Sequence, residues 1–356
     1  MIHARDLVQT FSTKQGRKKV EVRAVDGVTL DVAEGEVVGF LGPNGAGKTT
    51  TLRMLTTLLT PTSGTATVAG FDVVRDSRAV RRSIGYVSQA GGVSSYARAG
   101  DEVVDHGMLY GLSRAEATRR GHELFEQLDL PGMWQRTPKQ MSGGQKRRLD
   151  IAMGLVHDPT LIFLDEPTTG LDPQARANLW EHIAGLRRDR GATVFLTTHY
   201  LDEADALSDR IIIIDRGRIV ASDTAENLKA SISGDLVDVE VTDAARLPEA
   251  AAALESMAAS VEVEDRHVRG RVARAGRAVP GLLRELDRTG VTLEGIEVHR
   301  PTLDDVFLTL TGRSLRDAES GPSAPDEPTG PSGSSGSEAT SDSGPSSPIE
   351  TVGAVQ

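Results

Sequence analysis

The sequence has no cysteine and no long apolar run, and both absences narrow what the chain can be. Without cysteine, its 356 residues form no disulfide, hold no thiolate nucleophile and offer no cysteine ligands for zinc. The longest aliphatic runs, such as residues 211–214, fall far below the 18 or so residues that a membrane helix needs. The N-terminus also lacks the charged-then-apolar pattern of a signal peptide. We therefore expect a soluble protein, or one held at a membrane by a partner.

The chain also has too few basic residues to balance its acidic ones. The formal net charge is −11 at pH 7. Proteins that bind DNA or RNA generally present a basic surface to the phosphates. The charge therefore argues against a general nucleic-acid binder, and we expect no nucleic-acid partner.

Three regions of different composition follow one another along the chain. Residues 1–230 alternate short apolar strands with amphipathic helices, which predicts an α/β domain with buried strands at residues 37–41, 161–164, 193–196 and 211–214. Residues 235–312 predict a small accessory α+β domain with the order β-α-β-β-α-β of a ferredoxin-like sandwich. Residues 313–356 are rich in Ser, Gly and Pro, which predicts a disordered tail.

One segment of the first region matches a complete phosphate-binding loop, Gly-x-x-x-x-Gly-Lys-Thr. It comprises Gly42, Pro43, Asn44, Gly45, Ala46, Gly47, Lys48 and Thr49, and Thr50 follows it. An apolar strand precedes the loop and a helical pattern follows it, which is the context that the motif requires. Glycines let successive backbone N–H groups face an anion, and the helix N-terminus favours negative charge. We expect Lys48 to reach the β- and γ-phosphates of a nucleoside triphosphate and Thr49 to bind Mg²⁺.

Two neighbouring carboxylates end a second apolar strand. Asp165 and Glu166 follow the strand at residues 161–164, and adjacent side chains of a strand point in different directions. Asp165 can therefore approach the Mg²⁺ shell while Glu166 faces the water that attacks the γ-phosphate. Alone, the pair is equally consistent with a strand end bearing two solvated acids. Beside a phosphate-binding loop, it indicates phosphoryl transfer to water.

A Ser-Gly-Gly sequence opens a helix and forms a possible second anion site. Met141 precedes Ser142, Gly143, Gly144 and Gln145, and a basic helical segment follows. Backbone donors and the helix dipole coincide at such a terminus. In isolation the sequence is weak evidence, because Ser-Gly-Gly is also an ordinary turn.

Together these motifs resemble the ATP-binding cassette (ABC) family, which carries such a signature shortly before the second acidic motif. Other positions match the family in order: Gln89 resembles its Mg²⁺-contacting glutamine, Asp172 its D-loop aspartate, and His199 its switch histidine. Phe11 stands where the family stacks an aromatic ring on adenine, with Val25 beside it. Alone, Gln89, His199 or Phe11 would be ordinary core or surface residues. The ordered set over residues 11–199 makes the resemblance specific.

The resemblance implies a fold, a mechanism and partners. The fold is a P-loop NTPase cassette with a helical subdomain. ATP and Mg²⁺ are the cofactors; Lys48, Glu166 and His199 are the catalytic residues; and Thr49, Gln89 and Asp165 hold the metal. In this family two cassettes clamp two ATP molecules head to tail. Each ATP contacts the loop of one subunit and, from the other, the residues matching Ser142, Gly143, Gly144, Gln145 and Asp172. One copy of each motif therefore implies a homodimer.

The segment at residues 301–312 resembles the end of one subgroup, the ATPase subunits of daunorubicin/doxorubicin-type exporters. In these systems a separate polytopic permease forms the membrane domain. We therefore expect a peripheral protein at the cytoplasmic face of the cell membrane that powers the export of a drug-like, amphipathic compound. Two alternatives remain open: the ATPase of an importer, and a soluble ABC ATPase that acts on ribosomes or DNA.

Overall fold

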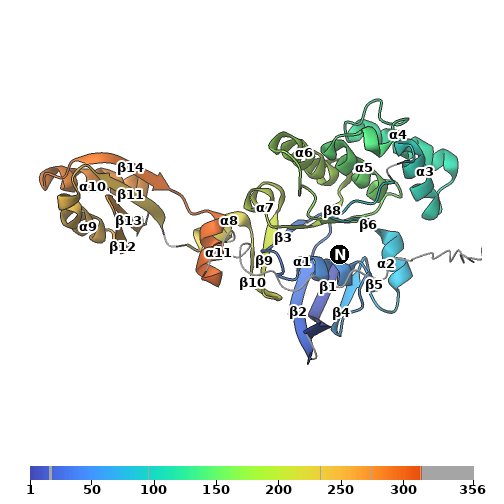
Figure 1. Cartoon of the computed structure of the whole chain (residues 1–356), viewed down its shortest axis with the longest axis horizontal. Helices are drawn as coiled ribbons and strands as arrows, with labels where there is room; N and C mark the ends of the chain where they lie inside the picture. Colours follow the sequence, from blue (N-terminus) through green and yellow to red (C-terminus); the bar gives the residue numbers. More distant parts are fainter. Residues whose placement is uncertain (16–17, 95, 233, 274, 313, 315–356) are drawn as a thin grey trace, which may run out of the picture. The chain divides into compact units, whose positions relative to one another are not determined.

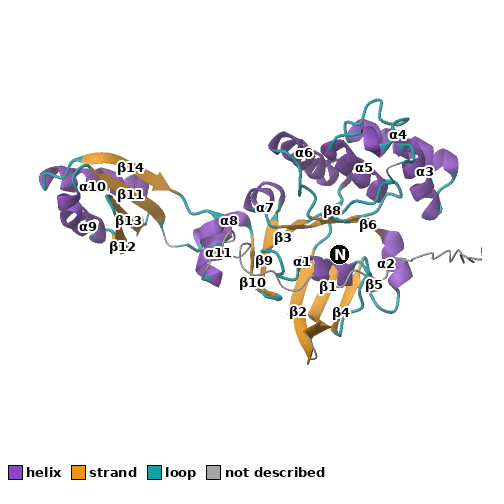
Figure 2. Ribbon diagram, viewed as in Figure 1, coloured by secondary structure: helices purple, strands orange, loops and turns teal. Residues whose placement is uncertain are grey.

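The computed structural model describes residues 1–15, 18–94, 96–232, 234–273, 275–312 and 314. All of them belong to one unit of the chain, residues 1–323. Apart from Ser314, the predicted tail lies outside the described residues. The predicted α/β class is confirmed by three sheets with helices between and around them (Figures 1 and 2).

A largely parallel sheet forms the centre of the cassette. Its strands lie in the order β10 (Arg218–Asp223), β9 (Arg210–Asp215), β3 (Val37–Leu41), β8 (Thr193–Thr198), β7 (Leu161–Asp165) and β6 (Ile84–Val87). Neighbouring strands from β9 to β6 are parallel, and only β10 is antiparallel. Continuous apolar runs suit this sheet because both of its faces are covered. Parallel pairing also brings the carboxyl ends of β3, β6, β7 and β8 to one edge.

One face of the central sheet packs against helix α1 (Lys48–Leu55) and an antiparallel sheet (Figure 1). That second sheet has the order β2 (Lys18–Val32), β1 (Ile2–Gln15), β4 (Ser63–Val68) and β5 (Phe71–Asp72), and α2 (Ser77–Ser83) follows it. Val38 and Phe40 of β3 point into this layer with Leu52 of α1, and all three are fully buried.

The opposite face of the central sheet carries the helical subdomain. Its helices are α3 (Ala99–Leu109), α4 (Arg114–Gln127), α5 (Gly143–Leu155) and α6 (Pro173–Arg190), with a 3₁₀ turn at Pro138–Gln140. Val37 of β3, Ile162 of β7 and Val194 of β8 pack against them. Alternation along each strand therefore divides the core into two layers.

A third core cluster joins residues that are distant in the sequence. Leu41, Ile211 and Ile213 of the central sheet pack against α7 (Leu201–Leu207), α8 (Ala225–Ala230) and α11 (Leu303–Thr311). Helix α11 contributes the buried residues Leu303, Val306 and Phe307. The last helix of the described chain therefore packs on the cassette.

The small accessory unit has the predicted order of elements. It contains β11 (Asp235–Val241), α9 (Leu247–Glu255), β12 (Ala258–Glu264), β13 (His267–Val272), α10 (Ala275–Arg288) and β14 (Leu293–His299), with a 3₁₀ turn at Ala244–Arg246. The antiparallel sheet has the order β12-β13-β11-β14. Alternate residues of β11 and β13 pack under α9 and α10. The predicted ferredoxin-like arrangement is confirmed.

None of the helices in the described part of the chain is both long enough and apolar enough to cross a bilayer.

Candidate active site

The phosphate-binding loop connects β3 to α1 and has two positions where only glycine fits. A Cβ atom built on Gly42 would lie 2.3 Å from the carbonyl oxygen of Ile214. Gly47 has φ +102°, and its Cβ would lie 2.6 Å from the carbonyl oxygen of Ala24. Gly47 is also the N-cap of α1 and offers no side chain to cap it. The first turn of α1 is therefore built to meet an anion through backbone N–H groups.

Lys48 is buried at the start of α1. Its Nζ donates hydrogen bonds to the carbonyl oxygens of Gly42 at 2.8 Å and Pro43 at 3.1 Å. The same atom lies 3.4 Å from Oε1 of Glu166, across the loop. A 4 % exposed ammonium held in this way is poised inside the loop for a phosphate.

Thr49 and Asp165 bring two oxygens together at the end of β7. The Thr49 hydroxyl donates to Oδ1 of Asp165 at 3.2 Å, and the Thr197 hydroxyl donates to the same atom at 2.6 Å. Burial raises the pKa of Asp165, although the Thr197 hydrogen bond opposes the rise. Hydroxyl and carboxylate oxygens are the ligands that Mg²⁺ prefers. The pair fits a magnesium ion.

Glu166 is the centre of the site, and four side chains converge on it. Gln89 Nε2 donates to its Oε2 at 2.8 Å, and the Thr169 hydroxyl donates to the same oxygen at 3.1 Å. His199 Nδ1 lies 3.3 Å from Oε2, and Lys48 Nζ approaches the other oxygen. The strand ends of β6, β7 and β8 therefore bring Gln89, Glu166 and His199 together.

The surroundings of Glu166 favour its charged form. Burial alone would raise the pKa, but His199 and the charge of Lys48 outweigh it and lower the pKa of Glu166 to about 2. Its backbone has φ +42°, in the left-handed region that non-glycine residues rarely adopt. Such strain persists only where the surrounding structure holds it, and it is frequent at active sites.

The residues predicted to contact the ATP held by the other subunit lie at the N-termini of two helices. Ser142 caps α5: its hydroxyl accepts from Gln145 N at 3.2 Å, and Gln145 Oε1 accepts from Ser142 N at 2.9 Å. Asp172 caps α6 by accepting from Ala175 N at 2.8 Å. Ser142, Gly143 and Asp172 are exposed. Their contact with a partner's nucleotide stays a prediction.

The predicted adenine contacts lie on the long hairpin of β1 and β2. Val25 is fully buried, and its side chain would be 3.4 Å from a Cβ on Gly47, against the phosphate-binding loop. Phe11 is half-buried and pairs with Val22 on the adjacent strand. Their role toward adenine stays a prediction.

Sequence reasoning gave no role to three residues that contact the site. Thr197 bonds Asp165, Arg147 reaches the backbone on both sides of Glu166, and Asp150 bonds the chain after Gln89. A signal for Arg147 was present: it shares the apolar stripe of α5 with Ile151 and Leu155 at helical spacing. An arginine on a buried stripe indicates a guanidinium with internal acceptors. Thr197 carried no such signal.

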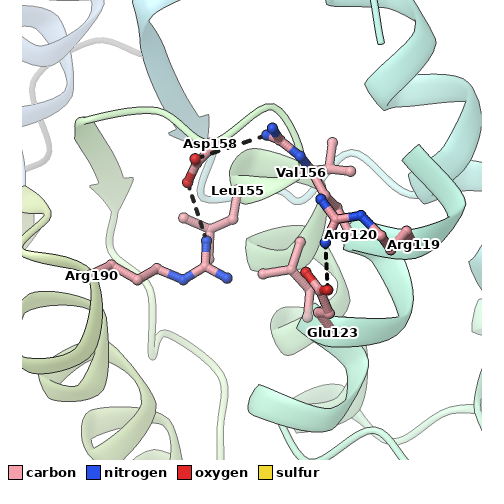
Figure 3. Close-up of a pocket in the computed structure, with 8 residues that line it drawn as sticks. Arg119, Arg120, Glu123, Leu155, Val156, Asp158 and Arg190 are labelled. Atoms are coloured by element: carbon pink, nitrogen blue, oxygen red, sulfur yellow. Dashed lines mark hydrogen bonds and ion pairs between the residues drawn. The ribbon is translucent and has the colours of Figure 1, made fainter. Parts of the chain in front are cut away.

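A concave region of about 300 Å³ lies between α4, α5 and α6, apart from the residues around Glu166 (Figure 3). Its charged residues face one another: Asp158 lies 4.0 Å from Arg120 and 3.6 Å from Arg190, and Arg119 pairs with Glu123. Because each of these arginines is paired with a carboxylate, we assign no ligand to this pocket.

A glycine loop between β3 and a helix, with two carboxylates at the end of β7 on the same edge of the sheet, defines a P-loop nucleoside triphosphatase. Residues 25–169 match the family ABC transporter, and residues 224–311 match the ATP-binding protein DrrA1-3-like C-terminal domain. A daunorubicin resistance ATP-binding protein of Streptomyces coeruleorubidus is 42% identical over 88% of this chain and 100% of its own length. The chain thus belongs to the ATP-hydrolysing ATP-binding proteins of the ABC transporter family.

More distant relatives and solved structures agree with this assignment. A linearmycin resistance ATP-binding protein of Bacillus subtilis is 33% identical over 89% of this chain and 100% of its own length. A dimeric ATP-binding cassette solved in a post-hydrolysis state with ADP and Pi is 27% identical, with TM-score 0.57 over 63% of this chain and 98% of its own. The predicted cassette fold and ATPase activity are confirmed.

Proposed function

We propose that this protein is the ATP-hydrolysing subunit of an exporter, in which a homodimer of cassettes drives a separate membrane permease. The observation that carries the catalytic part is the convergence of Lys48, Gln89, Thr169 and His199 on Glu166, within 3.4 Å. Bound ATP and Mg²⁺ would supply the phosphoanhydride and the charge that its transfer to water requires.

The residues of this chain have separate roles in that proposal. Thr49 and Asp165, with Gln89, would hold the metal, while Lys48 would hold the β- and γ-phosphates. When Lys48 and His199 turn to the phosphates, Glu166 loses the groups that lower its pKa. Its carboxylate then orients water and accepts a proton as general base. Hydrolysis is therefore favoured only in the loaded site.

The exposed helix N-termini support the proposed dimer. Ser142 and Gly143 begin α5 on the surface, and Asp172 begins α6 there as well. We infer that they complete the partner's ATP site, as the dimeric cassette with ADP and Pi supports.

Transport rests on the relatives. Proteins named for daunorubicin, doxorubicin and linearmycin resistance match most of this chain, as does a Nod factor export protein of Paraburkholderia xenovorans at 37% identity. We infer export of a drug-like, amphipathic compound and a peripheral position at the cytoplasmic face of the membrane, through the permease.

Two experiments test the proposal. Glu166→Gln should cut ATP hydrolysis about 10²- to 10⁴-fold, the usual worth of a positioned base, and ATP-dependent dimers should accumulate in size-exclusion chromatography. A near-wild-type rate would refute the role of Glu166. Affinity capture from gently solubilised cells should then yield a polytopic membrane protein in stoichiometric amount. Ribosomal or DNA-repair proteins in its place would refute transport.

A further inference from the structure

Helix α5 carries a buried guanidinium that contacts only backbone in the hydrogen bonds described for it. Arg147 is 7 % exposed. Its Nη1 donates to the carbonyl oxygen of Ser88 at 2.5 Å, Nη2 to that of Asp165 at 2.9 Å, and Nε to that of Pro167 at 2.7 Å. A buried charge is costly unless it is well hydrogen-bonded, and the planar fork of arginine can meet three separate acceptors.

The three carbonyl groups flank the two residues that meet in the site. Ser88 directly precedes Gln89, while Asp165 and Pro167 stand on either side of Glu166. Arg147 therefore holds the backbone on both sides of the strained Glu166, whose φ is +42°. It also fixes the end of β6 from which Gln89 reaches Glu166 at 2.8 Å.

A second side chain of α5 holds the chain beyond Gln89. Asp150 lies one turn after Arg147, and its Oδ1 accepts a hydrogen bond from Gly92 N at 2.8 Å. Gly91 has φ +76°, and a Cβ there would lie 2.8 Å from Asp150 Oδ2. The segment that carries Gln89 is thus held at Ser88 and again at Gly92 by the same helix.

Helix α5 also begins at the Ser142-Gly143-Gly144 sequence, in which Ser142 and Gly143 are exposed. Arg147 lies about 6 Å along the helix from Gly143, at 1.5 Å per residue. A displacement of the helix N-terminus would therefore reach the Arg147 contacts through about one rigid turn. One helix links the surface proposed to meet the partner's nucleotide to the catalytic groups of its own chain.

We propose that Arg147 and Asp150 are positioning residues, through which α5 holds Gln89 and Glu166 in the geometry for hydrolysis within their own subunit. The proposal rests on the proposed function for the role of Glu166 and for the dimer. Neither residue touches substrate; both act through the backbone that carries the catalytic side chains.

Steady-state kinetics of full-length variants provide the first test. Arg147→Gln and Arg147→Lys should each lower kcat for ATP about 10- to 100-fold, the range typical of residues that orient a catalytic shell. The KM for ATP should stay within about 3-fold, because the Lys48 loop is untouched. Arg148→Gln is the matched control: it removes the same charge from the same helix, and Arg148 pairs with Asp129 at 3.2 Å, away from the site. Equal kcat values for the Arg147 and Arg148 variants would overturn the proposal.

Asp150 offers a conservative pair of substitutions. Asp150→Asn keeps an oxygen that can accept from Gly92 N and should retain kcat within about 3-fold, whereas Asp150→Ala should lose about 10-fold or more. If Asp150 had only a structural role, its substitution would lower the thermal midpoint without this difference in kcat between Asp150→Asn and Asp150→Ala. Loss of kcat in both variants at equal thermal midpoints would contradict the assigned contact.

Mixed dimers distinguish an effect of Arg147 on Glu166 of its own subunit from a loss of activity of the whole dimer. In one mixture, an Arg147→Gln subunit with intact Glu166 pairs with a Glu166→Gln subunit. In the other, Arg147→Gln and Glu166→Gln share one subunit and the partner is wild type. Only the second arrangement leaves an intact Arg147 beside the working Glu166, so it should hydrolyse ATP at least about 10-fold faster. Equal rates would overturn the proposal. Failure of Glu166→Gln to dimerise with ATP would instead refute the proposed dimer mechanism, and the Arg147 and Arg148 kinetics would still decide the positioning role.

Discussion

Thr197 gives the sharpest test of how Asp165, the proposed Mg²⁺ ligand, is held. Its side chain is fully buried on β8, and its hydroxyl donates to Asp165 Oδ1 at 2.6 Å. Thr197→Val keeps the shape and removes the hydroxyl. The Glu166 N–H keeps a partner in this variant, because it donates to the Thr197 carbonyl at 3.1 Å as well as to the hydroxyl at 3.0 Å. The variant therefore removes the bond to Asp165 without leaving the Glu166 N–H unpaired.

The expected loss of stability and of activity in Thr197→Val follows from the chemistry of the hydrogen bond to Asp165. A hydrogen bond to a charged group contributes about 1.5–3 kcal/mol, and a buried carboxylate that loses it becomes under-solvated. We expect Thr197→Val to lower the free energy of unfolding by about 2 kcal/mol. Mg²⁺-dependent ATP hydrolysis should fall about 10- to 100-fold, because an orienting partner of a metal ligand is lost.

Thr197→Ser is the matched control. It keeps the hydroxyl and loses one buried methyl group, which costs about 1 kcal/mol of stability. Its hydrolysis rate should stay within about 3-fold of wild type. Chemical denaturation and a Mg²⁺ titration of ATPase activity measure both effects. If Thr197→Val hydrolyses ATP as fast as Thr197→Ser, with the same Mg²⁺ dependence, the reasoning about Asp165 is refuted.

Three further predictions concern the loop and Glu166. Gly47→Ala should lose ATP binding in calorimetry, because the backbone there has φ +102° and the new Cβ would lie 2.6 Å from a carbonyl oxygen. Gly281→Ala in α10 is the matched control: its Cβ would lie in open space, and the variant should keep the wild-type ATP affinity. Equal ATP affinities of the two variants would contradict this. Lys48→Ala should abolish tight ATP binding, and an unchanged nucleotide affinity would refute its role. Glu166, with a pKa near 2 against an ordinary 4.5, stabilises the fold above pH 4.5 and loses that contribution as pH falls. The stability difference between wild type and Glu166→Gln should thus shrink by about 1 kcal/mol from pH 7 to pH 4 in denaturant titrations, and a constant difference would contradict the pKa.

Local sequence patterns were sufficient to predict the phosphate-binding loop and the strands. The Gly42–Thr49 segment predicts its own strand–loop–helix context, because glycine conformation and helix-terminal donors are properties of a few adjacent residues. The apolar runs that became β3 and β7 are equally local signals. The strands of the accessory unit were predicted in the same way, from the alternation of apolar and polar residues along β11 and β13.

The contacts within the site required the tertiary structure. Gln89, Glu166 and His199 end three strands whose order in the sheet, β8-β7-β6, no local pattern states. The separation of Asp165 from Glu166 followed from strand alternation, but the positive φ of Glu166 and its four partners did not. The packing of α11 on α7 and α8 likewise depends on a chain return across the whole accessory unit.

By itself, the sequence determined the ATP-hydrolysing class of the protein and predicted which residues surround the phosphates, because that chemistry depends on short motifs with fixed spacing. Only the tertiary structure decided how the motifs act on one another. Arg147, Asp150 and Thr197 contact the site because folding placed them against backbone and carboxylate groups that lie far away in sequence. Burial removes water as a competing partner, so the few acceptors within reach then dictate where each donor points.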